Sequence, residues 1–152
     1  TQQAILDADF IVLAPGDLYS SILPNLLVKG VPEAIERSRA EIIHVCNLMT
    51  KHGETDNFRA SDFLSELTRA LGSNTNIDYC LVDNTEYDNQ LLKTYMEELS
   101  YPVLVDLDRS SNFAKEIRVS RLSSAGNLIR HDPTLLASEI SQFVQVTGNT
   151  ND

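Results

Sequence analysis

Continuous apolar runs alternate with helix-like patterns along this chain. The runs are short and bounded by turn-forming residues, which is typical of strands that are covered on both faces of a sheet. They predict strands over residues 9–14, 41–46, 77–82, 102–105 and 116–122. Apolar residues at helical spacing predict helices over residues 19–28, 60–71 and 88–99, a short helix from residue 31, and a closing helix that begins at Pro133 behind Asp132 as N-cap.

The order of these elements predicts an α/β fold. Strands that alternate with helices imply right-handed crossovers and a mainly parallel sheet. For the helix over residues 60–71, Ser61 is the predicted N-cap and Gly72 the predicted stop. Ligands of open α/β sheets bind outside the carboxyl ends of the strands. The polar segments that follow the first two strands are therefore the candidate site.

The first of these segments is a tight turn. Pro15, Gly16 and Asp17 end the first apolar run, and Ser20 and Ser21 follow. Gly16 is predicted to adopt a backbone conformation that a Cβ would forbid, so that another group approaches closely. Backbone N–H groups and the two serines would then face a phosphate, whereas Asp17 suits sugar hydroxyls or a metal better. The alternative is an ordinary turn that Asp17 or Ser20 caps.

The second segment is a long polar loop over residues 47–56. Functional residues concentrate in such loops. Its candidates for ligand contacts are Asn47, Thr50, Gly53, Glu54 and Thr55. Glu54 and Asp56 would act as general bases or metal ligands, and Lys51 would meet a phosphate. The alternative is a solvated loop in which Asp56 or Asn57 prepares the next helix.

The charge balance narrows the choice of partners. The formal net charge of −10 argues against a general nucleic-acid-binding surface, but it is compatible with a small anionic ligand. No apolar run approaches the roughly 18 residues of a membrane span. Cys46 and Cys80 each lie in an apolar run, and we expect reduced core residues, which favours a cytoplasmic location.

Catalytic motifs are absent from the sequence. The chain contains no GxGxxG, Walker A, HExxH, CxxC or GxSxG pattern. The spacing of the three histidines, His44, His52 and His131, does not resemble a zinc site, so no metal is predicted. His44 is predicted to be structural. The acidic residues of two further segments are predicted to be solvated, namely Glu97, Glu98, Asp106 and Asp108.

The extent of the chain suggests an excerpt of a longer protein. It begins Thr1-Gln2-Gln3 and enters a strand-like run almost at once. Residues 1–147 are predicted to form one domain or part of one, with a frayed tail over residues 148–152. An incomplete sheet would expose an edge that pairs with another chain, and a homodimer is one expected result.

Three stretches of the chain are distinctive, namely ADFIVLAPGDLYSSILPNLLVKGVPEAI, HVCNLMTKHGETDNFRASDFL and the ending RHDPTLLASEI. They resemble the carboxy-terminal half of the YvcK/CofD-like family. The family includes gluconeogenesis factors and 2-phospho-L-lactate transferases. The LYSSILPNLLV run and the NLMT-x-x-GET loop resemble the gluconeogenesis-factor branch. That branch usually has Gly-Ser where Gly16-Asp17 stands and often His where Phe63 stands.

The resemblance implies a Rossmann-like three-layer sandwich that is an incomplete part of a nucleotide-binding domain. It implies a regulatory protein that binds UDP-N-acetylglucosamine or another nucleotide ligand and affects carbon metabolism, cell shape and peptidoglycan synthesis. A Gly-Gly-Thr-Gly loop of the family is missing here, as expected of an excerpt. The implied ligand-binding residues are Pro15, Gly16, Asp17, Ser20, Ser21, Asn47, Thr50, Gly53, Glu54 and Thr55.

Two other functions stay open. One is a phospholactate-type transferase that uses a nucleotide donor, with Asp17 or Asp56 as base or metal ligand. The other is a protein-interaction module, in which the acidic surface rather than the two loops would carry the function.

Overall fold

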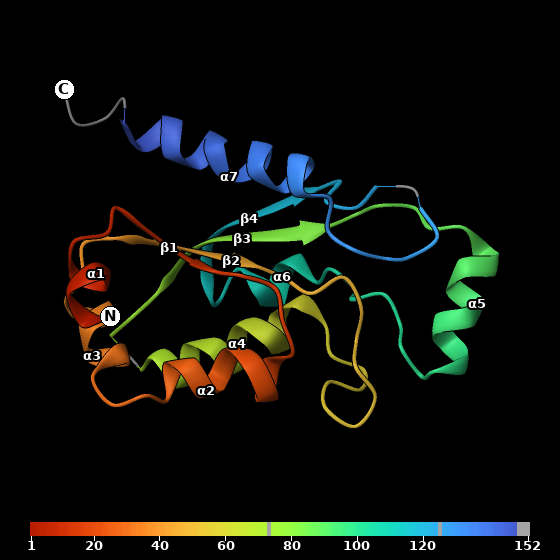
Figure 1. Cartoon of the computed structure of the whole chain (residues 1–152), viewed down its shortest axis with the longest axis horizontal. Coiled ribbons are helices and arrows are strands. Elements are labelled where there is room, and N and C mark those ends of the chain that lie inside the picture. Colours follow the sequence, from red (N-terminus) through yellow and green to blue (C-terminus); the bar gives the residue numbers. More distant parts are fainter. Residues whose placement is uncertain (73, 125, 149–152) are drawn as a thin grey trace.

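The centre of the fold is a four-stranded sheet (Figure 1). The computed structural model describes residues 1–72, 74–124 and 126–148. All three strand pairings are parallel, and the strand order is β1-β2-β3-β4. The strands are Phe10–Leu13 (β1), Glu41–Val45 (β2), Ile77–Asp83 (β3) and Ala114–Ser120 (β4). The predicted α/β fold with a parallel sheet is confirmed.

Helices cover both faces of the sheet, which gives three layers. In Figure 1, α7 lies above the sheet, and α2 and α4 lie below it. The helical elements are α1 (Gln2–Leu6), the π-helical turn η1 (Leu18–Ile22), α2 (Leu23–Leu26), α3 (Val31–Arg37), α4 (Ala60–Leu71), α5 (Asn89–Glu97), α6 (Leu107–Ser110) and α7 (Pro133–Gly148). Within the described residues, no helix has the length and apolar character of a membrane span.

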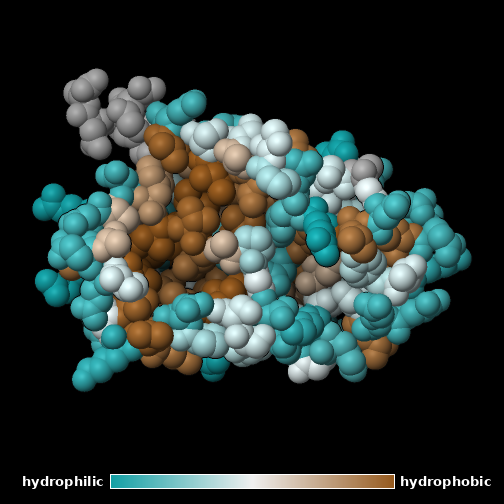
Figure 2. Space-filling model, viewed as in Figure 1, coloured by the Kyte–Doolittle hydropathy of each residue, from teal (hydrophilic) through white to brown (hydrophobic). Residues whose placement is uncertain are grey.

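The core has one hydrophobic cluster on each face. The larger cluster, on the α4 side, includes the fully buried Phe63 and both cysteines. The smaller one joins Ile43 and Leu81 to Phe143 of α7. Cys46 and Cys80 are buried free thiols, as predicted. Apolar surface also stays exposed between α7 and α2, over β1 (Figure 2).

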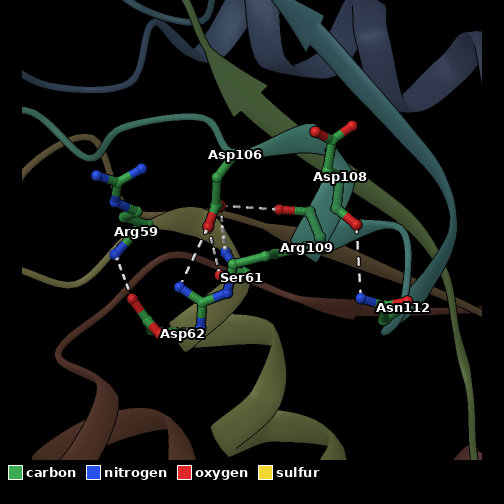
Figure 3. A network of polar contacts seen from close by, with 8 residues as sticks. Arg59, Ser61, Asp62, Asp106, Asp108, Arg109 and Asn112 are labelled. Carbon is green, nitrogen blue, oxygen red and sulfur yellow. Dashed lines mark hydrogen bonds and ion pairs between the residues drawn. The ribbon is translucent and has the colours of Figure 1, made fainter.

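Asp106 holds the start of α4, so the prediction that it is solvated is wrong. Its carboxylate accepts from the Ser61 N–H at 3.0 Å and from the Ser61 hydroxyl at 2.6 Å (Figure 3). The Ser110 hydroxyl donates to it at 3.1 Å, and the Arg109 guanidinium lies 3.7 Å away. Asp108 is exposed, as predicted. The carboxylate of Asp106 therefore joins α4 to α6.

The predicted N-cap of α4 is also wrong. Ser61 lies within the first helical turn, and Arg59 is the N-cap. The Arg59 N–H donates to the Asp62 carboxylate at 2.8 Å. Ser61 instead donates hydrogen bonds to Asp106, which is far away in sequence. Gly72 does end the helix, with a φ of 94° that favours glycine.

The strand predicted over residues 102–105 is absent from the sheet. Val103 donates its N–H to the Leu48 carbonyl at 2.9 Å, and Leu104 accepts from the Ala60 N–H at 3.0 Å. The extended segment thus pairs with the loop after β2 and with the start of α4. A short apolar run with β propensity forms an extended segment in either setting, so the sequence does not distinguish this pairing from a strand of the sheet. The fifth predicted strand exists as β4, which begins and ends two residues earlier than predicted.

The helices α5 and α7 both form where the sequence predicts them, but only α7 packs against the sheet. α5 forms as predicted, but none of its residues is buried, and it stands away from the sheet (Figure 1). α7 begins as predicted, since the Asp132 carboxylate accepts from the N–H groups of Thr134 and Leu135 at 2.9 and 3.1 Å. α7 includes Gly148, and the rest of the predicted frayed tail, residues 149–152, lies outside the described residues.

Candidate functional site

The two polar segments predicted to form a site contact each other. Parallel strands end at the same edge, and Leu13 at the end of β1 is in register with His44 near the end of β2. The Asn47 side-chain amide donates to the Gly16 carbonyl at 2.8 Å. A bridge of three charged side chains adds to this contact. Its Lys51 Nζ lies 2.6 Å from the Asp17 carboxylate and 2.7 Å from that of Glu54.

An open cavity of about 570 Å³ lies at this edge of the sheet. Its volume is within the range of small-molecule sites, about 300–1,000 Å³. Three walls come from the segments after β1, after β2 and before α7, and α5 contributes one aromatic residue. The lining residues are Pro15, Gly16, Asp17, Asn47, Leu48, Met49, Tyr95, Ile129, Arg130 and His131.

Four of the predicted site residues line this cavity, namely Pro15, Gly16, Asp17 and Asn47. The other six lie outside its lining, and their ligand contacts stay a prediction. Thr50 and Thr55 are buried, and their hydroxyl oxygens accept backbone N–H groups, from Tyr101 at 2.9 Å and from Lys51 at 2.8 Å. These contacts hold the loop in shape. The remaining residues are Ser20, Ser21 and Gly53, which are exposed, and Glu54, which is in the Lys51 bridge.

Gly16 does not have the backbone conformation that its sequence context predicts. Positive φ values occur at Gly30, Gly53 and Gly72, and Gly16 is not among the glycines in this region. A Cβ at Gly16 would lie 3.6 Å from its nearest neighbours, which is ordinary van der Waals contact. The chain's own packing therefore tolerates alanine at this position. A requirement for glycine would have to come from a group outside this chain segment.

The third wall of the cavity was missed from the sequence. Arg130 is exposed, and its guanidinium has no hydrogen bond or ion pair to any described residue. The Tyr95 hydroxyl accepts from the Ile129 N–H at 3.0 Å, so α5 holds this wall in place. The strand-end rule could have found Arg130, because it lies in the polar connection after β4. No local signal could have found Tyr95.

Two lining residues carry buried polar atoms without partners. Asn47 Oδ1 and His131 Nε2 have no hydrogen-bond partner among the described residues. Burial lowers the pKa of His131, so its imidazole is neutral at pH 7. Unpaired buried polar atoms are costly, and at a cavity wall they are available to a ligand. Within the described residues, no group of three His, Cys, Asp or Glu side chains could hold a metal ion.

Stability is expected to fall by about 2 kcal/mol between pH 7 and pH 5 because of His44. This residue is fully buried, and burial lowers its pKa to about 4. An unfolded chain takes up a proton below about pH 6.5 that the folded chain refuses, so the stability present above that pH is lost on acidification. Urea unfolding at several pH values measures this effect.

The matched control for this prediction is His44→Leu, which removes the titrating group. The pH dependence of its unfolding free energy should be shallower, with a residual slope of the same sign from His131. Equal slopes in the two proteins would contradict the assignment to His44.

Comparisons with known proteins show the family of this chain and agree with its fold. A family model described as 2-phospho-L-lactate transferase CofD matches residues 1–123. A Thermotoga maritima protein that carries the provisional name of gluconeogenesis factor is 40% identical over 145 residues, which cover 93% of this chain and 46% of that protein. The gluconeogenesis factor of Halalkalibacterium halodurans is 43% identical over 104 residues, 68% of this chain and 32% of that protein.

A solved structure has the same fold. The crystal structure of a Bacillus halodurans protein matches with a TM-score of 0.86 and 34% identity, over 91% of this chain and 45% of that chain. The chain therefore spans less than half the length of these relatives. The cavity wall at residues 129–131 lies beyond the part that the family model matches.

Proposed function

The chain belongs to the CofD family, and from this we propose that it binds a nucleotide sugar of the UDP-N-acetylglucosamine type as part of a gluconeogenesis-factor-like regulatory protein. The relatives with that name support the regulatory branch. Effects on carbon metabolism, cell shape and peptidoglycan synthesis are part of the proposal.

The observation that carries this proposal is an unpaired cation in the cavity of an acidic protein. Arg130 lines the cavity, while the chain as a whole has a net charge of −10. A guanidinium binds phosphate oxygens through two parallel charge-assisted hydrogen bonds. The diphosphate of the ligand would meet Arg130 from the open side of the cavity.

The other lining residues suit the neutral parts of such a ligand. Asn47 Oδ1 would accept a hydrogen bond from a sugar hydroxyl or a base N–H, and the neutral imidazole of His131 would add a second contact. Tyr95 and Ile129 offer the apolar surface on which a flat base packs. Asp17, which would repel phosphate, is neutralised by Lys51.

Calorimetric titration of the full-length natural protein tests this function. Saturable heat is expected with UDP-N-acetylglucosamine, weaker binding with UDP, and no binding with N-acetylglucosamine alone. Gly16→Ala is expected to lower the affinity about tenfold, or about 1.4 kcal/mol, through steric obstruction of the ligand. Its thermal unfolding midpoint should not change, because the added Cβ fits the fold. No heat with any nucleotide would refute the proposal.

The second candidate is a transferase, which the description of the matching family model favours. Asp17 lines the cavity and would be its base once released from Lys51. Asp56 is a weaker candidate, because it is outside the lining and its carboxylate accepts from the Gly53 N–H at 2.8 Å. Incubation of the full-length protein with nucleotide donor, hydroxyl acceptor and magnesium tests this function. Formation of a phosphodiester product would replace the binding role with catalysis.

A further inference from the structure

A second cavity lies at the amino ends of the strands, opposite the candidate site. In Figure 1 the strand arrows point away from this end of the sheet, which lies beside α3. The cavity has a volume of about 340 Å³, within the range of small-molecule sites. Its walls come from the end of α3, the first residues of β2 and the segment before β3, and most of its lining residues are polar. Each buried polar group here needs a partner, either in the protein or in a ligand.

One part of the lining has a structural role. Asp78 is buried, and its carboxylate accepts from the Ile42 N–H at 2.7 Å. The same carboxylate forms an ion pair with the Lys115 ammonium. These contacts join the first residues of β2, β3 and β4 to one another. Asp78 and Lys115 therefore satisfy each other and leave the rest of the cavity to be explained.

Two other groups in the lining have no such partners. Thr75 is only 6% exposed, and its hydroxyl oxygen has no hydrogen-bond partner among the described residues. The same is true of Oε2 of Glu41, the first residue of β2. Burial and the nearby Glu41 carboxylate raise the pKa of Tyr79, so this neighbour is an uncharged phenol at pH 7. An unpaired buried oxygen costs free energy, and a carboxylate oxygen costs more than a hydroxyl.

The charges around the cavity indicate which ligand would supply the missing partners. Three carboxylates and two cations line it, which leaves an excess of one negative charge. Lys115 is already paired, and Arg39 is exposed, so solvent screens its charge and it makes no proposed contact. Within the described residues, no group of three His, Cys, Asp or Glu side chains could hold a metal ion. An ammonium group suits the site better, because it carries a positive charge together with three N–H donors.

We propose that this cavity binds a small organic amine in its ammonium form. The Glu41 carboxylate accepts a charge-assisted hydrogen bond from the ammonium, and the Thr75 hydroxyl bonds to a polar group beside it. The site is separate from the cavity at the carboxyl ends of the strands, so its occupation does not depend on the nucleotide sugar. It would give the protein a second, chemically different ligand.

Titration of the full-length natural protein with ethanolamine, followed by the NMR shifts of its amides, tests the proposal. Ethanolamine carries one ammonium and one hydroxyl, which match Glu41 and Thr75. Saturable shifts are expected at the amides of Glu41, Ile42 and Thr75, with a Kd of about 1 mM. Ethylene glycol lacks the charge and tetramethylammonium lacks N–H donors, so neither should give saturable shifts. Equal shifts with tetramethylammonium, or none with ethanolamine, would overturn the proposal.

Glu41→Gln is expected to weaken the binding of ethanolamine at least about tenfold, because the amide keeps the shape of the side chain but not its charge. Glu33→Gln is the matched control, since Glu33 is exposed on α3 and lies outside the cavity lining. It removes the same charge, and its Kd should stay within about twofold of the original. Equal losses in the two variants would overturn the proposal.

Thr75→Val separates a ligand contact from a structural one. The substitution replaces the hydroxyl by a methyl group of similar size and is expected to weaken the binding of ethanolamine about threefold. The thermal unfolding midpoint of the free protein should stay the same or rise, because an unpaired buried hydroxyl is removed. A lower midpoint would show that the hydroxyl stabilises the fold, and an unchanged Kd would show that it does not meet the ligand. Either result would overturn the proposal.

Discussion

Arg130→Ala is expected to weaken the binding of UDP-N-acetylglucosamine about 100-fold, or about 2.7 kcal/mol. Arg130 is the cation of the cavity that has no ion pair among the described residues. Its removal would leave the diphosphate with Lys51, which already has two carboxylate partners. Titration calorimetry of the full-length variant measures the loss. Arg130→Lys should recover part of the affinity, because an ammonium keeps the charge but not the paired hydrogen bonds.

The matched control for this prediction is Arg39→Ala. Arg39 is exposed and precedes β2, so it lies at the amino ends of the strands, opposite the carboxyl ends where the cavity lies. Its substitution changes the net charge by the same amount, so a general electrostatic effect would appear in both variants. The affinity of Arg39→Ala should stay within about twofold of the original. Equal losses in the two variants would remove Arg130 from the binding site.

Asp106→Ala is expected to lower the free energy of unfolding by about 3 kcal/mol. The substitution removes the acceptor of three hydrogen bonds, two from Ser61 and one from Ser110 (Figure 3). Both serines are fully buried, so water cannot replace the lost partner without opening the structure. Arg109 would also lose one of its two carboxylate neighbours. Urea unfolding measures the change.

Asp108→Ala is the neighbouring control. Asp108 is exposed, and the contact drawn to it in Figure 3 involves its backbone carbonyl. Its substitution should change the free energy of unfolding by about 0.5 kcal/mol or less. A similar loss in both variants would show that the charge of α6, rather than the hydrogen bonds of Asp106, stabilises the structure.

Local patterns were sufficient for the four strands that form the sheet and for four of the ten residues that line the cavity. The apolar runs of β1 and β2 could be read directly, and parallel pairing then brought Gly16 and Asn47 together. The strand-end rule indicates the segment of Arg130 as a candidate, but local patterns do not place it in the same cavity, because it lies more than 80 residues further along the chain than Asn47. The hydrogen bond that holds this wall, from the Ile129 N–H to the Tyr95 hydroxyl, joins two segments that no sequence pattern relates to each other.

The errors have the same origin. Local patterns predict a helix cap at Ser61 and a surface carboxylate at Asp106. In the structure the two side chains form a hydrogen bond with each other across 45 residues of sequence. Residues 102–105 have the composition of a strand, but the backbone groups that they meet belong to a loop and a helix start. Propensity describes how a segment is shaped, and only the tertiary fold selects the segment with which it pairs.

The bridge between Asp17, Lys51 and Glu54 affects how ligand binding depends on ionic strength. When a ligand phosphate takes the place of one of these carboxylates on Lys51, the ammonium exchanges one anionic partner for another. Salt screens the two arrangements to a similar degree, and this exchange adds little to the salt dependence of binding. Arg130 starts with no such partner, and its new contact would be fully sensitive to screening. The dependence of the ligand affinity on salt concentration would therefore report the phosphate contact of Arg130 and only weakly that of Lys51.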